Sequence, residues 1–180
     1  MYFNEQGTTN TQKTVELALQ AAKAQNIGHI VLASSTGFTA EQFVDCGANV
    51  VCVTSVCGFA EKGVNIMPNE MQHSLKTKGI KVLTASHVLS GVERGLSSKF
   101  KGIYPAEIMA HTLRMFGQGV KVCVEISIMA LDAGLIPYDE KIIAIAGTKR
   151  GADTAVILTP AHAQYVLETR IHEIICKPVL

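Results

Sequence analysis

The sequence predicts a single α/β domain with a doubly wound, mainly parallel sheet between two layers of helices. Short apolar runs rich in β-branched residues alternate with segments of helical period, which is typical of parallel sheets covered by helices. Hydrophobic residues make up 48% of the chain and charged residues 17%, which excludes a disordered chain. A length of 180 residues suits one hydrophobic core spanning residues 1–180.

The first half of the chain predicts a helix followed by three parallel strands with helical crossovers. In residues 11–25, Val15, Ala18, Leu19 and Ala22 form one helical stripe. Short apolar runs bounded by glycine or polar residues predict strands at 29–33, 49–54 and 80–84. Helical segments are expected between them at 39–46 and 68–78.

The second half predicts two consecutive helices and three more strands. Pro105 begins a helix that stops at Gly117, and a second, largely buried helix covers 120–133. Its charged residues, at spacings of four and seven, are expected to form a narrow solvent-facing edge: Lys121, Glu125 and Asp132. Strands are expected at 141–146, 154–159 and 170–176, the last with the alternation of an edge strand.

Residues 85–104 lack both helical and strand period and are rich in glycine and serine. Long loops of this kind in compact domains often form lids or walls of ligand sites. The other interpretation is a mobile surface excursion without a ligand.

Charge and cysteine content limit the classes of partner. Sixteen basic against fifteen acidic residues give a net charge of +1, so nucleic acid is not expected as a partner. Five cysteines, an odd number and mostly within apolar runs, indicate reduced thiols and a cytoplasmic protein. The N-terminus shows no signal-peptide order, and the longest apolar stretch, Val122 to Leu131, is far below the ~20 residues that span a bilayer, so no membrane partner is expected.

The turn after the first predicted strand carries the strongest functional signal. Four hydroxyl residues and one glycine occur within six positions: Ser34, Ser35, Thr36, Gly37, Phe38 and Thr39. At a strand-to-helix junction, unpaired backbone N–H groups favour an anion, and glycine permits close backbone approach. The sequence therefore predicts a phosphate-binding loop for a phosphorylated small molecule. Thr39 as a helix cap, with Gln42 completing a capping box, is the structural alternative.

The same string resembles the phosphate loop of flavodoxins, in which Ser or Thr, any residue, Thr, Gly, any residue and Thr join a strand to a helix. Ser34, Thr36, Gly37 and Thr39 fill that pattern here. The resemblance implies flavin mononucleotide (FMN) as the cofactor and hence a flavoprotein. The chain has no Trp, so Phe38, Phe59, Phe100 and Tyr104 are the aromatic residues available to flank the flavin.

A second glycine-rich loop lies between two predicted strands and contains two cations: Gly147, Thr148, Lys149, Arg150 and Gly151. Such cations can close over a phosphate or carboxylate. The alternative is an ordinary loop with solvated Lys149 and Arg150. In a doubly wound sheet, ligands bind at the carboxyl ends of the strands, where the two glycine loops are expected to meet.

Three stretches together resemble the carboxyl-terminal α/β domain of pyruvate kinases, and a family of small stand-alone proteins similar to it. They are HIVLASSTGFTAEQ, NVVCVTS and GVKVCVEISIMALDAGLIPYDEKIIAIAGTKRGADTAVIL. In pyruvate kinases such loops bind the phosphates of an allosteric sugar bisphosphate, which implies that the 34–39 turn holds one phosphate. Gly147, Arg150 and Gly151 would close the other side. Related domains associate, so a homo-oligomer is expected by resemblance.

Pyruvate kinase activity is not expected, because the kinase active site lies on a separate barrel that this sequence does not encode. Phe38 stands where the kinase loop commonly has a basic residue, so one phosphate on an apolar or aromatic body fits better than two phosphates.

Other residue groups give weaker signals. Cys52 and Cys57 lack a second pair or a nearby histidine, so no metal site is expected. The enzyme alternative is proton transfer on a phosphorylated metabolite by His87, Glu93 or Lys99. A third possibility is a regulatory or interaction protein that retains the fold. The favoured hypothesis is a binding protein, with no catalytic residue identified.

Overall fold

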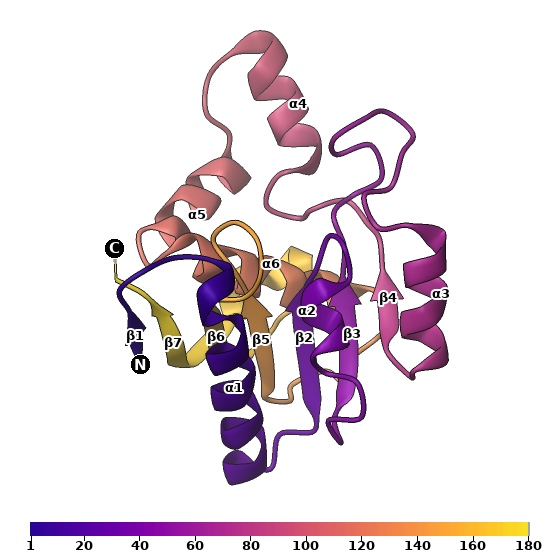
Figure 1. Cartoon of the computed structure of the whole chain (residues 1–180). Helices are drawn as coiled ribbons and strands as arrows, with labels where there is room; N and C mark the ends of the chain where they lie inside the picture. Colours follow the sequence, from indigo (N-terminus) through magenta and orange to yellow (C-terminus); the bar gives the residue numbers. More distant parts are fainter. Residues whose placement is uncertain (180) are drawn as a thin grey trace.

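The computed structural model describes residues 1–179 and contains one seven-stranded sheet in the order β1-β7-β6-β5-β2-β3-β4 (Figure 1). β6 runs antiparallel to both of its neighbours, and every other pairing is parallel, which confirms the mainly parallel sheet. The strands are β1 (Tyr2–Phe3), β2 (His29–Ala33), β3 (Asn49–Val53), β4 (Lys81–Leu83), β5 (Ile142–Ala146), β6 (Thr154–Thr159) and β7 (Arg170–Pro178).

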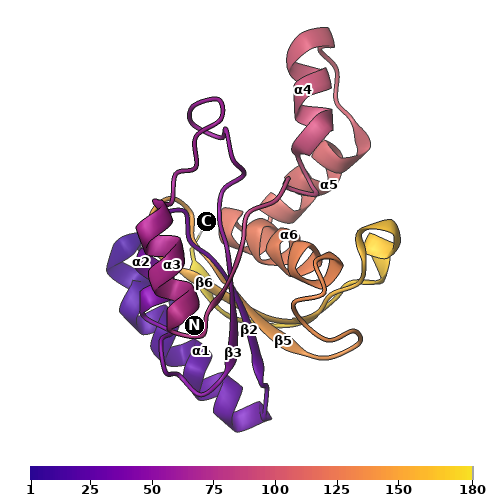
Figure 2. The same ribbon diagram turned by 90° about the vertical axis from the view of Figure 1, so that its right-hand side faces the viewer.

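Helices cover both faces of the sheet, so the predicted three-layer architecture is confirmed. Figure 2 shows α1, α2 and α3 on one face and α6 on the other. The α-helices are α1 (Thr11–Gln25), α2 (Phe38–Glu41), α3 (Asn69–Thr77), α4 (Gly91–Phe100), α5 (Pro105–Arg114) and α6 (Gln118–Asp132). Two 3-10 helices, η1 (Thr8–Asn10) and η2 (Ala163–Glu168), complete the fold.

The strands divide their side chains between two hydrophobic cores, because successive residues of a strand point to opposite faces. In β2, Ile30 and Leu32 pack on the α1 side, whereas Val31 packs on the α6 side. All three are fully buried. A strand covered on both faces therefore appears in the sequence as a continuous apolar run, which is why 29–33 was predictable.

The predicted helix at 39–46 is shorter in the structure. α2 ends at Glu41, because Asp45 (φ 55°) and Gly47 (φ 81°) adopt left-handed backbone angles that a continuing helix excludes. A single turn has little macrodipole, so binding at this turn depends on individual N–H and hydroxyl groups.

The prediction that 85–104 lacks helical structure is wrong, because α4 occupies residues 91–100. Its glycine and serine content concealed an apolar spacing of four at Val92, Leu96 and Phe100. No residue of α4 is buried, and α4 projects from the body together with α5 (Figures 1 and 2).

The predicted solvent edge of α6 is also wrong in two of its three positions. Lys121 and Glu125 are buried and form an ion pair with each other. The second carboxylate oxygen of Glu125 accepts the backbone N–H of Leu89 at 3.0 Å. Burial lowers the pKa of Lys121, and the Glu125 carboxylate opposes this effect. Only Asp132 is exposed as predicted.

β7 is not an edge strand along its whole length, because the short strand β1 pairs with its carboxyl end. The N-terminal segment is held further by Asp153, which is fully buried and accepts the backbone N–H of Gly7 at 3.0 Å. Among residues 1–179, no helix is both long and apolar enough to cross a membrane.

Candidate functional site

The carboxyl ends of β2, β3, β4 and β5 lie along one edge of the sheet, the upper edge in Figure 1. β2 lies between β5 and β3, so the 34–39 turn that follows β2 has the loops after β5 and β3 as its neighbours. Crevices at this edge are where open α/β sheets bind ligands. The candidate site is therefore built from the turns that follow these strands.

Two residues of the 34–39 turn determine its shape. Ser34 is buried, and its hydroxyl accepts the backbone N–H of Gly37 at 3.1 Å. Gly37 has φ 97°, and a Cβ atom there would lie 2.6 Å from the side chain of Met71 in α3. Thr39 is also buried. The Ser34 hydroxyl is thus engaged within the turn, and little of Thr39 is exposed.

Thr39 does not cap a helix, which was the alternative to a phosphate-binding role. The N-cap of α2 is Gly37, which makes no side-chain cap, and Thr39 lies within the helix. The threonine is therefore a buried helical residue, and no capping box involves Gln42.

The remaining residues of the turn are exposed and carry hydrogen-bond donors. Ser35, Thr36 and Phe38 are exposed. Among residues 1–179, their backbone N–H groups have no protein acceptor. The Ser35 hydroxyl lies 2.7 Å from the hydroxyl of Ser55, which follows β3. This cluster presents hydroxyl and N–H donors to the outside of the protein, the chemistry that an anion requires.

Hydroxyl groups continue along the edge beyond Ser55. The Thr54 hydroxyl lies 2.6 Å from that of Thr84, which follows β4. The sequence prediction did not include Thr54, Ser55 or Thr84. Each comes immediately after an apolar strand, in VCVTS and KVLTAS, so the first polar residues after each strand were the available signal.

A pocket of about 570 Å³ opens between the segment after β3 and the segment after β4, and its lining includes Val56, the residue that follows Ser55. Its aromatic wall is formed by Phe59 and His87, whose ring centroids are 6.2 Å apart at 44°. Apolar, hydroxyl and basic groups share its lining: Val56, Phe59, Ser86, His87, Ser90, Gly91, Val92 and Arg94. The segment 85–104 thus contributes one wall of the pocket, as one of its two interpretations expected.

The second glycine loop is tied to the protein body by a buried carboxylate and by the close packing of its glycines. Thr148 donates its N–H to Asp153 at 3.1 Å. A Cβ atom on Gly147 would lie 2.2 Å from the carbonyl oxygen of Gly151, and one on Gly151 would lie 2.3 Å from the Thr11 hydroxyl. Both glycines are thus required by close packing. Lys149 and Arg150 are exposed, and their loop follows the strand adjacent to β2.

The three residues considered for proton transfer are not brought together. His87 lines the pocket. The Glu93 carboxylate instead accepts the backbone N–H of Ala106 at 2.7 Å, and the Lys99 amine lies 5.2 Å from the centroid of the Phe100 ring. Of the three, His87 is the residue placed to meet a ligand.

The cysteines are free, and their environments differ. Cys52 is buried, and desolvation raises the pKa of its thiol to about 12. Cys57 is exposed. Within residues 1–179, no group of three or more histidine, cysteine or acidic residues is arranged to hold a metal ion.

Comparison with known proteins gives a match to one family model and similarity to solved structures. The family model described as "Pyruvate kinase, alpha/beta domain" matches residues 12–158. Similar solved structures include a pyruvate kinase from Cryptosporidium parvum, with 16% identity over 75% of this chain and 20% of that chain and a TM-score of 0.39. The Cryptosporidium parvum pyruvate kinase in complex with ADP has 16% identity over 82% of this chain and 22% of that chain, with a TM-score of 0.42. The chain thus spans about a fifth of the length of these kinases.

Proposed function

Since the chain belongs to the family of the pyruvate kinase alpha/beta domain, we propose that it is a binding protein for a phosphate-bearing small molecule, with FMN as the favoured ligand. The observation that carries the proposal is the exposed donor cluster of Ser35, Thr36, Phe38 and Ser55 at the carboxyl ends of β2 and β3. Its three backbone N–H groups have no acceptor among residues 1–179, and a pocket with an aromatic wall begins at Val56, the residue after Ser55.

The phosphate would be held by the donor cluster. The Ser35 and Ser55 hydroxyls form a hydrogen bond with each other. Because a hydroxyl hydrogen turns about its C–O bond, each of them can donate to a phosphate oxygen instead. The exposed Thr36 hydroxyl adds a further donor, as do the N–H groups of Ser35, Thr36 and Phe38, which have no acceptor among residues 1–179. Lys149 or Arg150, from the loop after the adjacent strand, would neutralise the dianion.

The aromatic body of the ligand would occupy the neighbouring pocket. The pocket volume of about 570 Å³ lies within the ~300–1,000 Å³ typical of small-molecule sites. Phe59 and His87 offer ring surfaces, while Ser86, Ser90 and Arg94 offer polar groups for the edge of a flavin. If FMN is the ligand, it supplies hydride or electron transfer chemistry at this edge of the sheet.

The direct test is the visible absorbance of the freshly purified protein, followed by thermal denaturation with added FMN. We expect the yellow absorbance of flavin, or a rise in melting temperature with FMN that saturates. Thr36→Val should reduce that rise, whereas the control Thr77→Val, an exposed hydroxyl in α3, should not. A colourless protein whose melting temperature does not change with FMN would remove FMN as the ligand.

The position of His87 favours one second candidate, an enzyme acting on a phosphorylated metabolite. An imidazole in the pocket wall can exchange a proton near neutral pH. In that case His87→Ala would abolish turnover of a phosphorylated substrate while ligand binding remains. If no phosphorylated metabolite is turned over by the unmodified protein, the binding-protein proposal stands alone.

A further inference from the structure

The helix α4 stands apart from the body of the protein, and none of its residues is buried. Figure 2 shows it rising from the sheet edge opposite the segment that joins β3 to α3. Each of these two projections contributes residues to the pocket of about 570 Å³. Among residues 1–179, the polar contacts that α4 side chains make outside their own helix go to α5 alone. A helix with so few attachments moves at little cost in free energy.

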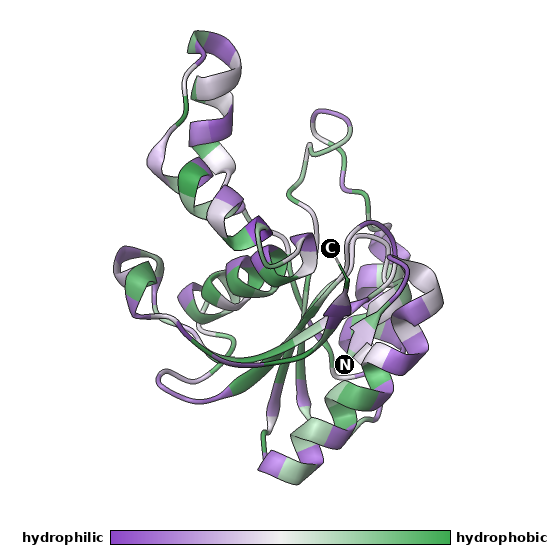
Figure 3. Ribbon diagram, turned by 90° about the vertical axis from the view of Figure 1, so that its left-hand side faces the viewer, coloured by the Kyte–Doolittle hydropathy of each residue, from purple (hydrophilic) through white to green (hydrophobic). Residues whose placement is uncertain are grey.

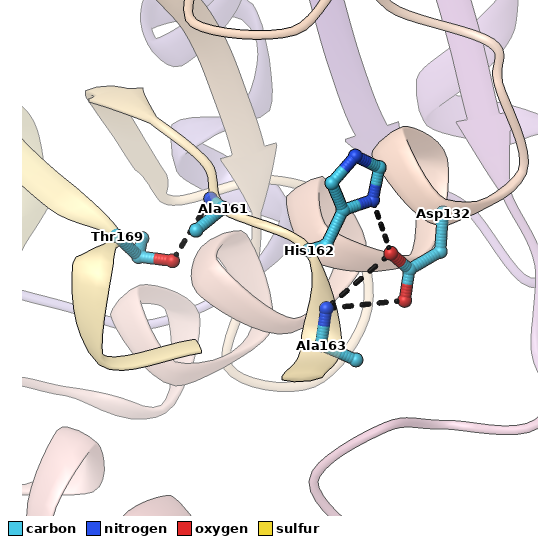
Figure 4. Close-up of polar contacts among 5 residues, drawn as sticks. All are labelled: Asp132, Ala161, His162, Ala163 and Thr169. Carbon is cyan, nitrogen blue, oxygen red and sulfur yellow. Dashed lines mark hydrogen bonds and ion pairs between the residues drawn. The ribbon is translucent and has the colours of Figure 1, made fainter. Parts of the chain in front are cut away.

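The segment η2 shows how this fold fixes a surface helix. The Asp132 carboxylate of α6 accepts the Ala163 N–H at 3.3 Å and lies 2.8 Å from Nδ1 of His162 (Figure 4). The Thr169 hydroxyl accepts the Ala161 N–H at 3.2 Å, so the two flanks of η2 are tied together. Within residues 1–179, the side chains of α4 form no equivalent bond to α6 or to the sheet.

Both ends of α4 are joints in the backbone. Gly91 begins the helix with φ 44°, and Gly102, two residues after its end, has φ 90°. A Cβ atom at either glycine would have no heavy atom within 4 Å beyond its neighbours in the chain, so close packing does not explain these glycines. Positive φ and open space instead allow the backbone to rotate at both joints, as hinge residues do.

Beyond each joint the chain is fixed. Leu89, before the first joint, is buried, and its N–H donates to the Glu125 carboxylate of α6 at 3.0 Å. After the second joint, the Tyr104 N–H donates to Glu107 at 3.2 Å as part of the capping box of α5. α5 in turn packs on α6. A helix between two hinges, with fixed points on either side, has the construction of a lid.

Exposed apolar side chains line the pocket from both projections. On α4, Val92 lines the pocket and is 79% exposed, and Leu96 lies one turn further on the same face. On the other side, Phe59 lines the pocket and is 53% exposed. Val64 is exposed in the same loop, which the Gly58 N–H closes by donating to the Val64 carbonyl at 2.9 Å. Figure 3 shows hydrophobic segments in both projections. Contact between them would remove this apolar surface from water.

We propose that α4 is a lid that swings about its two joints toward the segment after β3 and closes over a ligand in the pocket. The proposal rests on the ligand site proposed above. In the structure, two hydrogen bonds hold α4 to α5. The Ala106 N–H donates to Glu93 at 2.7 Å, and the Ser97 hydroxyl donates to Glu107 at 2.6 Å. Closure exchanges these bonds for apolar contact across the pocket, and a ligand that touches both walls favours the closed state.

The test uses the exposed native thiol of Cys57, in the segment after β3, and a second thiol introduced on α4 by Leu96→Cys. A disulfide requires the two Cβ atoms to lie within about 4.5 Å, so diamide oxidation links the two thiols only when α4 approaches that segment. Mass spectrometry of the linked peptides gives the rate. Without ligand, adding Ser97→Ala should raise this rate by about two- to twelvefold, the effect of one lost hydrogen bond on the equilibrium. Added FMN should raise the rate until the protein is saturated.

Two control proteins make the rate specific to closure. Ser98→Cys, in place of Leu96→Cys, puts the thiol on the opposite face of α4, so its linkage to Cys57 should be slow and should not respond to FMN or to Ser97→Ala. Cys57→Ser combined with Leu96→Cys should give no linked peptide from this segment. Circular dichroism establishes that each variant is folded.

The measurements with and without FMN distinguish failure of the lid from failure of the ligand. If Ser97→Ala raises the rate while FMN neither binds in a fluorescence titration nor changes the rate, the lid is supported and FMN is removed as the ligand. If FMN binds without changing the rate, the lid is overturned. A ligand-free rate that Ser97→Ala leaves unchanged, or that equals the rate from Ser98→Cys, would overturn it as well.

Discussion

The two loops that follow the paired strands β2 and β5 look alike in sequence and differ in how the protein holds them. Both combine glycine with hydroxyl residues after an apolar strand. After β5, Asp153 takes the N–H of Thr148 and of Gly7. After β2, the N–H groups of Ser35, Thr36 and Phe38 have no acceptor among residues 1–179. The loop after β5 is thus anchored by a buried carboxylate, whereas the turn after β2 keeps three backbone donors without a protein acceptor within residues 1–179.

The largest expected effect comes from removing the Asp153 carboxylate, which holds the loop after β5. Its carboxylate accepts the N–H groups of Gly7 and Thr148 and the Thr154 hydroxyl. Asp153→Ala leaves these donors unpaired in the interior, each at a cost of ~1–3 kcal/mol. We expect urea denaturation to show a loss of about 3 kcal/mol or more. A loss close to that of an ordinary surface substitution would contradict the structural role of this loop.

The second largest effect is a difference in stability between alanine substitutions at Gly147 and at Gly37, one in each loop. Gly147→Ala places a Cβ atom 2.2 Å from the Gly151 carbonyl oxygen, whose backbone cannot move aside easily. Gly37→Ala meets the flexible side chain of Met71 but has an unfavourable φ of 97°. We expect Gly147→Ala to destabilise by about 2–3 kcal/mol and Gly37→Ala by about 1 kcal/mol, measured by the same denaturation. The reverse order would be inconsistent with the packing described.

The thiol beneath the 34–39 turn gives a smaller, pH-dependent effect. The Cys52 Sγ lies 3.8 Å from the Ser34 carbonyl oxygen, and its pKa is raised from 9.0 to about 12. Above pH 9 the unfolded chain therefore releases a proton that the folded chain retains, so the contribution to stability is lost as pH rises toward 12. At pH 10 this loss is about 1 kcal/mol.

Cys52→Ala should have a shallower decline in unfolding free energy between pH 8 and about 10 than the unmodified protein. If the unfolding free energies of the two proteins decline equally with pH, the Cys52 thiol is not buried from solvent beneath the turn.

The fold was predictable where one periodicity extended over a whole element. The helix at 11–25 and the strand at 29–33 match the structure, because a stripe or a continuous apolar run marked each of them. β1 was not predictable, since two residues gain a strand only by pairing with Lys177 and Pro178 at the other end of the chain. The burial of Lys121 and Glu125 depends on their mutual pairing and on Leu89, a residue distant in sequence.

The candidate site was predictable in its turns, whereas its pocket wall at residues 85–104 was only one of two interpretations of that segment. Ser35 and Thr36 follow a strand whose ends are apparent in the sequence. The pocket between Phe59 and Arg94 depends on how the segments after β3 and β4 are placed relative to each other, which no local sequence pattern determines. α4, which supplies Arg94, is a helix without a buried face, so its burial pattern could not be anticipated.

The most direct measurement of the central claim compares the affinity of the protein for FMN with that for riboflavin, which lacks the phosphate, by fluorescence titration. We predict that FMN binds more tightly to the unmodified protein. Thr36→Val combined with Ser55→Ala should reduce this preference by about 1–3 kcal/mol, since each of the two lost donors contributes ~0.5–1.5 kcal/mol. Equal affinity for the two flavins, or a preference unchanged in the double variant, would contradict the claim that the exposed donors after β2 and β3 hold a phosphate.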